Sequence, residues 1–250
     1  YTLKGVVMNN SIKYNKNISI LAEADVIVAG SGPAGICAVV AAARCGAKTI
    51  LVERYGVVGG NLTVGHVGPI IGTVGKGTMK DELVKLLGVP DNDMIGEVGV
   101  AHDFEKAKIV LTEFVNHENI KVLLQTTVSD VIKEGNTVKG LIVSSKEGLF
   151  AIMAKVVIDC TGDGDVSFLA GVEINKGRDD GLMQPASHEF TIENIDESKG
   201  VVCIGDVDDV EFNGVRFLDY CKECADKGLI PEDLAAVRLH RTVTPGERQV

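Results

Sequence analysis

Three glycines and one glutamate have the types and the spacing needed to bind a dinucleotide. Gly30, Gly32 and Gly35 directly follow an apolar run, and Glu53 ends the next apolar run, about 20 residues downstream. The first glycine permits a tight turn, the second lets backbone NH groups approach a pyrophosphate, and the third lets a helix pack closely on the strand. The glutamate carboxylate can accept hydrogen bonds from both ribose hydroxyls of an adenosine and repels a 2′-phosphate. The sequence therefore predicts a dinucleotide site.

The elements that must position these residues form one strand-turn-helix-strand unit. An apolar strand ends at Ala29, an alanine-rich helix is expected over 34–45, and a second strand over 49–52. The positive end of the helix then points at the phosphates, so an anionic ligand is favoured there without a lysine. Val39 departs from the usual fingerprint, which prefers a smaller residue against the sheet. The alternative is a βαβ unit with a chance glycine turn, which the register of all its parts disfavours.

Composition and charge narrow the classes of partner. The chain has 250 residues, is 45% hydrophobic and carries a formal net charge of -10 at pH 7. This length and hydrophobic content are enough for one large domain or two connected ones. The acidic balance and the lack of a lysine-arginine cluster argue against nucleic acid or an anionic membrane as partner. No apolar run reaches the roughly 18 residues of a membrane span. Six cysteines in a chain of this length do not resemble a disulfide scaffold, so we expect a reducing, cytoplasmic location.

The chain divides into three segments. Residues 1–21 are expected to form an N-terminal arm, 22–176 a nucleotide-binding domain, and 177–250 the beginning of a second, substrate or cap domain. The expected elements of the first domain are helices over 80–87 and 103–118, a strand over 121–124, an antiparallel meander over 127–133, 138–144 and 149–154, a separate strand over 156–158 and a helix reaching Ala170. In the last segment, helices are expected over 215–227 and 231–237.

Five motifs together resemble the bacterial FAD-dependent oxidoreductase family, which is related to glutathione-reductase-like flavoproteins. The motifs are Gly30-x-Gly32-x-x-Gly35, Glu53-Arg54-Tyr55-Gly56, Gly59-Gly60, Thr161-Gly162-Asp163-Gly164-Asp165 and Gly181-Leu182-Met183-Gln184-Pro185. The resemblance covers about residues 22–190, and the combination is more specific than any single motif. It implies FAD as the cofactor and an α/β fold, in which a Rossmann-like FAD-binding domain combines a parallel sheet with an antiparallel β-meander.

The resemblance also implies which residues hold FAD. Segment 59–61 would lie along the diphosphate and the ribityl chain, and the backbone of Val128 would contact adenine. Thr161 and Gly162 would approach the adenosine, and Asp163 would lie near the cofactor. The predicted cofactor-binding residues are Gly30, Gly32, Pro33, Ala34, Gly35, Glu53, Arg54, Gly59, Gly60, Asn61, Val128, Thr161, Gly162 and Asp163.

Members of the resembled family continue well past the position that matches Val250. They continue through the rest of the substrate domain and a final glycine-containing segment that closes around the flavin. Both are absent here and no Met precedes Tyr1, which suggests a fragment, a processed chain or one subunit of a split enzyme. We therefore expect a partner chain or a missing C-terminal segment to complete the flavin site, and an oligomeric assembly.

Two histidines are candidates for acid/base chemistry, because imidazole titrates near neutrality. His66 lies in the glycine-rich run after Gly60 and could approach the flavin edge as a proton donor or acceptor. A hydrogen-bonded loop histidine is an equal alternative there. His188 could bind a substrate anion or hydroxyl, whereas His102, His117 and His240 are expected at the surface.

Two further patterns are not assigned a function. Asp159, Asp163 and Asp165 have some of the spacing of a calcium loop, but Ala170 stands where the bidentate glutamate is required. No metal site is therefore predicted. The pair Cys221 and Cys224 has redox or metal spacing, but it lies in an expected amphipathic helix without a second pair, which favours a plain helix.

These observations predict an FAD-dependent oxidoreductase. The flavin would transfer a hydride or an electron pair to or from a small organic substrate held under the second domain. The alternative is a non-catalytic or electron-transfer flavin subunit of a multi-chain complex. An NAD-dependent dehydrogenase ranks last, because a second fingerprint for a nicotinamide dinucleotide is missing and Gly59-Gly60 speaks against NAD in the first site.

Overall fold

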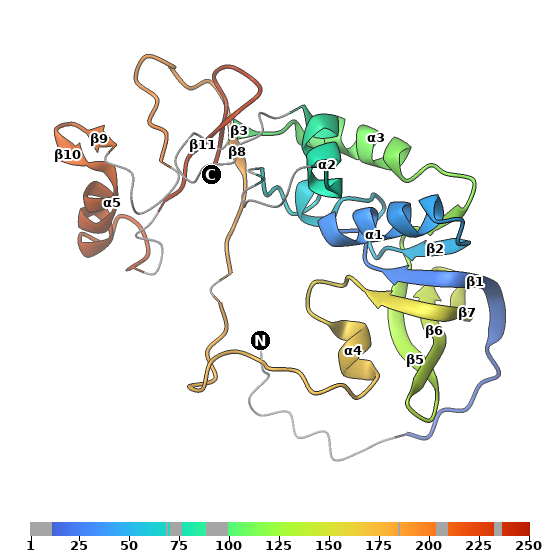
Figure 1. The fold of residues 1–250 in the computed structure, drawn as a ribbon. Coiled ribbons are helices and arrows are strands. Elements are labelled where there is room, and N and C mark those ends of the chain that lie inside the picture. Colours follow the sequence, from blue (N-terminus) through green and yellow to red (C-terminus); the bar gives the residue numbers. More distant parts are fainter. Residues whose placement is uncertain are drawn as a thin grey trace.

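A six-stranded sheet forms the body of the protein in the computed structural model (Figure 1). The structure describes residues 12–68, 70, 77–88, 100–184, 186–203, 210–232 and 237–250. In spatial order the strands are β4 (Ile120–Leu123), β2 (Thr49–Val52), β1 (Ser19–Ala29), β7 (Gly148–Asp159), β6 (Thr137–Ser145) and β5 (Thr127–Glu134). The first four pair in parallel, whereas β7, β6 and β5 form an antiparallel meander. The predicted α/β class, with a parallel sheet and a meander, is confirmed.

The parallel strands are covered on both faces. Helices α1 (Pro33–Arg44), α2 (Met79–Leu87) and α3 (Phe104–Phe114) form one core with strand residues that include Val28 and Leu51. Ile27 and Ile50 point to the other face, where they pack with residues of the meander and of α4 (Asp165–Leu169). Successive residues of a strand point to opposite faces. A strand segment buried on both faces is therefore apolar, which is the pattern seen over 26–29 at the end of β1 and over 50–52 in β2.

Helix α1 is held on the sheet by its regularly spaced apolar side chains. Ile36, Val39, Val40 and Ala43 recur at helical spacing and are buried. Val39 is fully buried, so the larger side chain noted in the sequence is accommodated in the core. The helix ends where Gly46, with φ at +85°, donates its NH to the carbonyl of Ala43 at 2.9 Å.

Strand β7 corrects the prediction of two separate strands over 149–154 and 156–158. It runs without a break, because it pairs antiparallel with β6 up to Met153 and in parallel with β1 as far as Asp159. Lys155, which lies between the two predicted ranges, is an exposed strand residue, and its Nζ lies 2.7 Å from Oδ1 of Asp25. Strand β1 likewise begins at Ser19, within the segment assigned to the arm. Residues 1–11 of that arm lie outside the described residues.

A second, four-stranded sheet lies beside the body. Its order is β3 (Val100–Ala101), β11 (His240–Thr242), β12 (Arg248–Gln249) and β8 (Thr191–Ile192). Strand β3 comes from the range 22–176 and pairs in parallel with β11. The second sheet therefore combines strands from both predicted domains.

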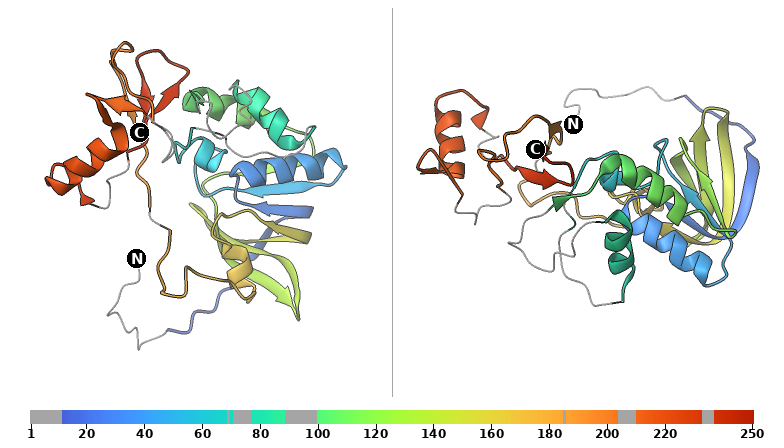
Figure 2. Two further views of the ribbon diagram at one scale, coloured as in Figure 1. Left: turned by 60° about the vertical axis from the view of Figure 1, so that its left-hand side comes forward. Right: turned by 90° about the horizontal axis from the view of Figure 1, so that it is seen from above.

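The remaining elements are β9 (Glu211–Phe212), β10 (Val215–Arg216) and α5 (Phe217–Asp226), which lie to one side of the body (Figure 2). The helix predicted over 215–227 begins two residues later than expected. Asn213 and Gly214, both with positive φ, form a tight hairpin turn, so the residues after them pair as a strand. Of the short helix predicted over 231–237, residues 233–236 lie outside the described residues. In the part of the chain that is described, no helix is long and apolar enough to cross a membrane.

An ion pair next to the second sheet predicts a pH-dependent stability. Nη2 of the buried Arg248 lies 2.7 Å from Oε2 of Glu197, and Nη1 lies 3.0 Å from Oε1. The Arg248 guanidinium and the NH of Gly246 lower the pKa of Glu197 from 4.5 to about 2. A carboxylate with a lowered folded pKa contributes its full stabilisation above its unfolded pKa and loses it as the pH falls through the folded pKa.

We therefore expect Glu197→Gln to lower the Tm at pH 7, with a difference from wild type that shrinks between pH 4.5 and about pH 2. Thermal melts of both proteins across this range measure the difference. An equal difference at both ends of the range would contradict the assignment.

Candidate functional site

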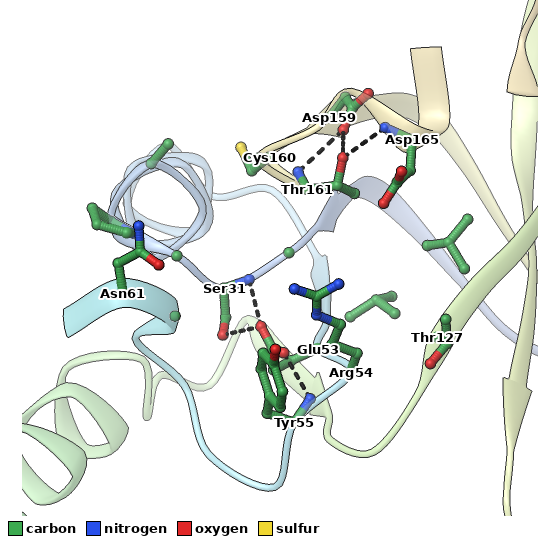
Figure 3. Close-up of a pocket in the computed structure, with 18 of the residues that line it drawn as sticks. Ser31, Glu53, Arg54, Tyr55, Asn61, Thr127, Asp159, Cys160, Thr161 and Asp165 are labelled. Carbon is green, nitrogen blue, oxygen red and sulfur yellow. Dashed lines mark hydrogen bonds between the residues drawn. The ribbon is translucent and has the colours of Figure 1, made fainter. Parts of the chain in front are cut away.

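A cavity of about 610 Å³ opens at the carboxyl ends of β1, β2 and β7 (Figure 3). The chain passes from β1 through α1 to β2 on one side, whereas β7 joins β1 on its other side. Ligands of α/β proteins bind at such points, where the strand order reverses. The predicted cofactor residues in the cavity wall are Gly30, Gly32, Pro33, Ala34, Glu53, Arg54, Gly60, Asn61, Val128, Thr161 and Gly162.

Close packing between backbones requires two of the glycines. A Cβ atom on Gly30 would lie 2.3 Å from the carbonyl oxygen of Cys160, and one on Gly35 would lie 1.9 Å from the carbonyl oxygen of Gly30. Gly35 is therefore in the packing behind the turn and does not belong to the cavity wall. Gly32 differs, because a Cβ there would meet nothing within 4 Å. The open space beside Gly32 is the room that a phosphate needs.

The N-terminus of α1 faces this space without a side-chain cap. Gly32 is the N-cap residue, and the helix has no acidic residue in its first turn. Its first hydrogen bond runs from the NH of Ile36 to the carbonyl of Gly32. Pro33 has no NH, and the NH groups of Ala34 and Gly35 have no partner within the helix. Of these two residues, Ala34 belongs to the cavity wall. This arrangement binds anions through NH donors and the helix dipole.

Glu53 lies in the cavity wall beside the glycine turn and is almost completely buried. Its Oε2 accepts hydrogen bonds from the NH of Ser31 at 2.9 Å and from the Ser31 hydroxyl at 2.5 Å. Its Oε1 accepts one from the NH of Tyr55 at 2.7 Å (Figure 3). A carboxylate offers about four acceptor positions, so Oε1 keeps one for a ribose hydroxyl. Sequence reasoning missed Ser31, although its place between the first two glycines puts it beside the acidic residue.

The turn after β7 is organised by Asp159. Its Oδ1 accepts from the NH and hydroxyl of Thr161, and its Oδ2 accepts from the NH and hydroxyl of Ser167. Burial opposes the charge of Asp159, but these four hydrogen bonds prevail and lower its pKa below the usual value. The carboxylate is therefore a fixed structural anion. Asp163, predicted near the cofactor, is exposed and lies outside the cavity wall, which contains Asp165 instead.

Cys160 places a thiol in the same wall. Burial raises the pKa of this thiol, and the neighbouring Asp159 carboxylate raises it further. A thiol with a raised pKa remains protonated near neutral pH and is a poor nucleophile. Cys160 therefore serves as a neutral packing residue beside Gly30.

The segment after β2 closes the cavity on another side. Gly59, with φ at +115°, donates its NH to the carbonyl of Ser31 at 2.9 Å and starts the short helix η1 (Gly60–Leu62). A Cβ on Gly60 would lie 2.8 Å from the Cα of Gly32, so this segment approaches the glycine turn closely. Gly59 supports the segment from behind, whereas Gly60 and Asn61 lie in the wall.

The start of β5 supplies the remaining wall. Thr126, Thr127 and Val128 all contribute to it. The NH of Thr126 donates to the carbonyl of Glu53 at 2.9 Å, which ties this strand to the end of β2. The two threonines were not predicted, although they immediately precede Val128 in the sequence. Arg54 and Tyr55 also belong to the wall, where the Arg54 guanidinium lies over the Tyr55 ring, 4.9 Å from its centroid.

The two candidate acid/base histidines lie outside the cavity wall. The His66 ring stacks on Phe104, with centroids 4.6 Å apart, and its Nδ1 is buried without a hydrogen-bond partner among the described residues. His66 follows Gly65, which does belong to the wall. His188 is exposed, and its ring is tilted 5.8 Å from that of Phe190. Their assignment to catalysis stays a prediction.

His102 corrects the prediction of a surface residue. It is completely buried, and its Nδ1 lies 2.9 Å from the carbonyl oxygen of Gly68 and its Nε2 2.7 Å from that of Leu62. The two carbonyl oxygens take the place of the water molecules that would hydrate an exposed imidazole. His117 and His240 are half-buried.

Comparisons with known proteins show which family and which relatives the chain is similar to. A family model described as FAD dependent oxidoreductase matches residues 25–247. The thiamine thiazole synthase of Methanococcus vannielii is 29% identical over 187 residues, which cover 71% of this chain and 70% of that protein. The thiamine thiazole synthase of Pyrococcus horikoshii is 27% identical, and the match covers 65% of this chain and 67% of that protein. The crystal structure of THI4 from Thermovibrio ammonificans matches 62% of this chain and 65% of its own, with 23% identity and a TM-score of 0.48.

Proposed function

Because the chain belongs to the family of FAD-dependent oxidoreductases, we propose that it binds FAD in the cavity and exchanges a hydride or an electron pair between the flavin and a small organic substrate. One observation carries the proposal: the uncapped N-terminus of α1 and the carboxylate of Glu53 face the same cavity. The helix N-terminus can bind an anionic diphosphate, and the carboxylate can bind an adenosine ribose in the same cavity.

In this proposal the chain's own residues bind and orient the cofactor. The NH of Ala34 and the positive end of α1 hold the diphosphate, the remaining acceptor position of Glu53 holds a ribose hydroxyl, and the backbone of Val128 contacts adenine. Gly60 leaves room for the chain that leads to the flavin. The bound flavin supplies the two-electron chemistry, and the protein supplies orientation and exclusion of water.

A proton must also be moved when a hydroxyl or an amine is oxidised. We assign this role to His66, which directly follows the cavity-lining Gly65 in the chain. His188 is the alternative. A proton acceptor with a fixed ring suits this role, and the stacking on Phe104 fixes the ring of His66.

A second candidate is the activity named for the archaeal relatives, thiamine thiazole synthase. The 29% identity over 71% of this chain favours it. A third candidate is an electron-transfer flavin subunit that depends on a partner chain. Unlike the other two, it would show no turnover as an isolated chain. Incubation of the purified chain with FAD and a panel of small alcohols, amines and acids separates them, since only the oxidoreductase reduces the flavin when a single substrate is added.

The cofactor proposal is tested by titration of the full chain with FAD, followed by flavin absorption and fluorescence. We expect a saturable complex with a Kd of about 1 μM or lower, which ADP displaces and 2′-phospho-ADP does not displace at about 100-fold higher concentration. A protein that neither retains nor takes up FAD would contradict the proposal. Equal displacement by both nucleotides would instead contradict the assignment of Glu53 to the ribose.

A further inference from the structure

The segment 60–68 has two sides with different surroundings. On one side Gly60, Asn61, Val64 and Gly65 belong to the cavity wall. On the other side its backbone carbonyls point at two side chains from outside the six-stranded sheet. The segment thus separates the cavity from the second sheet.

Two buried side chains bind the far side of this segment. His102, directly after β3, contacts the carbonyls of Leu62 and Gly68 with its two ring nitrogens, at 2.7 and 2.9 Å. Gln249 in β12 donates through Nε2 to the carbonyl of His66. His102 is fully buried and Gln249 is 1% exposed, so water does not replace these contacts. We call His102 and Gln249 the carbonyl clamp.

The clamp has little freedom to move. A Cβ on Gly68 would lie 2.2 Å from the Cβ of Ala101 in β3 and 2.6 Å from Oε1 of Gln249. The segment therefore packs directly on two strands of the second sheet, β3 and β12. Gln249 is itself fixed, because its Nε2 also donates to Oε2 of Glu189. Between the clamped carbonyls, His66 adopts a positive φ of +53°, a conformation that a non-glycine residue rarely adopts without support.

We propose that His102 and Gln249 are positioning residues, which fix segment 60–68 from the second sheet and thereby set the affinity of the cavity for FAD. The inference rests on the proposed function only in taking FAD as the ligand. A buried carbonyl that loses its donor must move toward another partner. Because Gly60 lies against Gly32, a shift of the segment changes the space that the diphosphate occupies.

The experiment compares FAD binding by full-length variants. Gln249→Met keeps the length of the side chain but removes the amide, and His102→Leu removes both ring nitrogens. We expect each to raise the Kd for FAD about tenfold, as the loss of one hydrogen bond to a buried group implies. His102→Gln keeps one donor nitrogen, that of the amide, and should recover part of the loss. The visible circular dichroism of bound FAD should also change in Gln249→Met, since the segment contacts the cofactor.

Glu197→Gln is the matched control. It weakens the contact to Arg248 in the same strand as Gln249, but its partners do not include segment 60–68. It should lower the Tm and leave the Kd and the spectrum of bound FAD unchanged. If Glu197→Gln raises the Kd as much as Gln249→Met, the effect is general destabilisation and the clamp is refuted.

The outcomes separate the clamp from the proposed function. Wild type that takes up no FAD refutes both. Wild type that binds FAD with variants of unchanged Kd refutes only the clamp. If His102→Leu fails to fold, the test rests on His102→Gln and Gln249→Met. Unchanged Kd values in both of these variants would then refute the clamp.

Discussion

Gly35→Ala is expected to lower the free energy of unfolding by about 4 kcal/mol or more and to abolish FAD binding. The added Cβ would lie 1.9 Å from the carbonyl oxygen of Gly30 and 2.8 Å from its carbonyl carbon. Both atoms belong to the backbone, so rotation of a side chain cannot relieve the clash. Either α1 moves away from β1 or the glycine turn opens, and each change removes the anion site. Urea unfolding followed by far-UV circular dichroism measures the loss.

Gly32→Ala is the control for this substitution. Gly32 has φ at -61°, and a Cβ there meets nothing within 4 Å. We expect its free energy of unfolding to stay within about 0.5 kcal/mol of wild type, as for an unstrained surface position. Its methyl group would nevertheless occupy the cavity, so FAD binding should weaken. Wild-type stability of Gly35→Ala would contradict the close contact between α1 and the turn.

Glu53→Gln is expected to have the second largest effect, on both stability and binding. The carboxylate accepts hydrogen bonds from the Ser31 NH and hydroxyl and from the Tyr55 NH. Whichever way the amide of Gln is turned, its NH₂ group faces at least one donor. Hydrogen bonds to a charged group contribute about 1.5 to 3 kcal/mol each, so we expect a loss of about 2 to 4 kcal/mol in the free energy of unfolding. Because the ribose acceptor position also changes, the Kd for FAD should rise about 100-fold.

A glutamate of the same sheet provides the comparison. Glu134 ends β5, and its side chain is 77% exposed, 3.7 Å from Lys139. Glu134→Gln removes the same charge and should change neither the unfolding free energy by more than about 0.5 kcal/mol nor the Kd. A loss of stability that is equal in the two variants would show that net charge, and not the hydrogen bonds of Glu53, is responsible.

The parts of the site that lie close together in sequence were predictable. The turn at Gly30, the helix after it and Glu53 occupy one continuous segment, and each residue type has a steric or electrostatic reason that holds before the rest of the chain is placed. The antiparallel meander was predictable for the same reason, because short turns connect its strands, Gly135-Asn136 between β5 and β6 and Lys146-Glu147 between β6 and β7.

The residues that were misplaced depend on distant partners. His102 is buried by carbonyls that lie 34 and 40 residues away in the sequence, which a local pattern does not reveal. The continuity of β7 depends on β1, because Val156 to Asp159 pair with Val26 to Ala29, 130 residues earlier in the chain. The short strand β3 pairs with β11 near the other end of the chain, so no periodicity in its own segment indicates the second sheet.

The position of β1 between β2 and β7 has a consequence for synthesis of the chain. One edge of β1 can pair with β2 soon after both have been made, but Ala29 pairs on its other edge with Asp159, about 130 residues later. At a translation rate of about 5 to 20 residues per second, this apolar edge stays open for roughly 6 to 26 s. An open strand edge recruits strands from other chains. Ribosome-bound nascent chains therefore need protection from aggregation until β7 emerges.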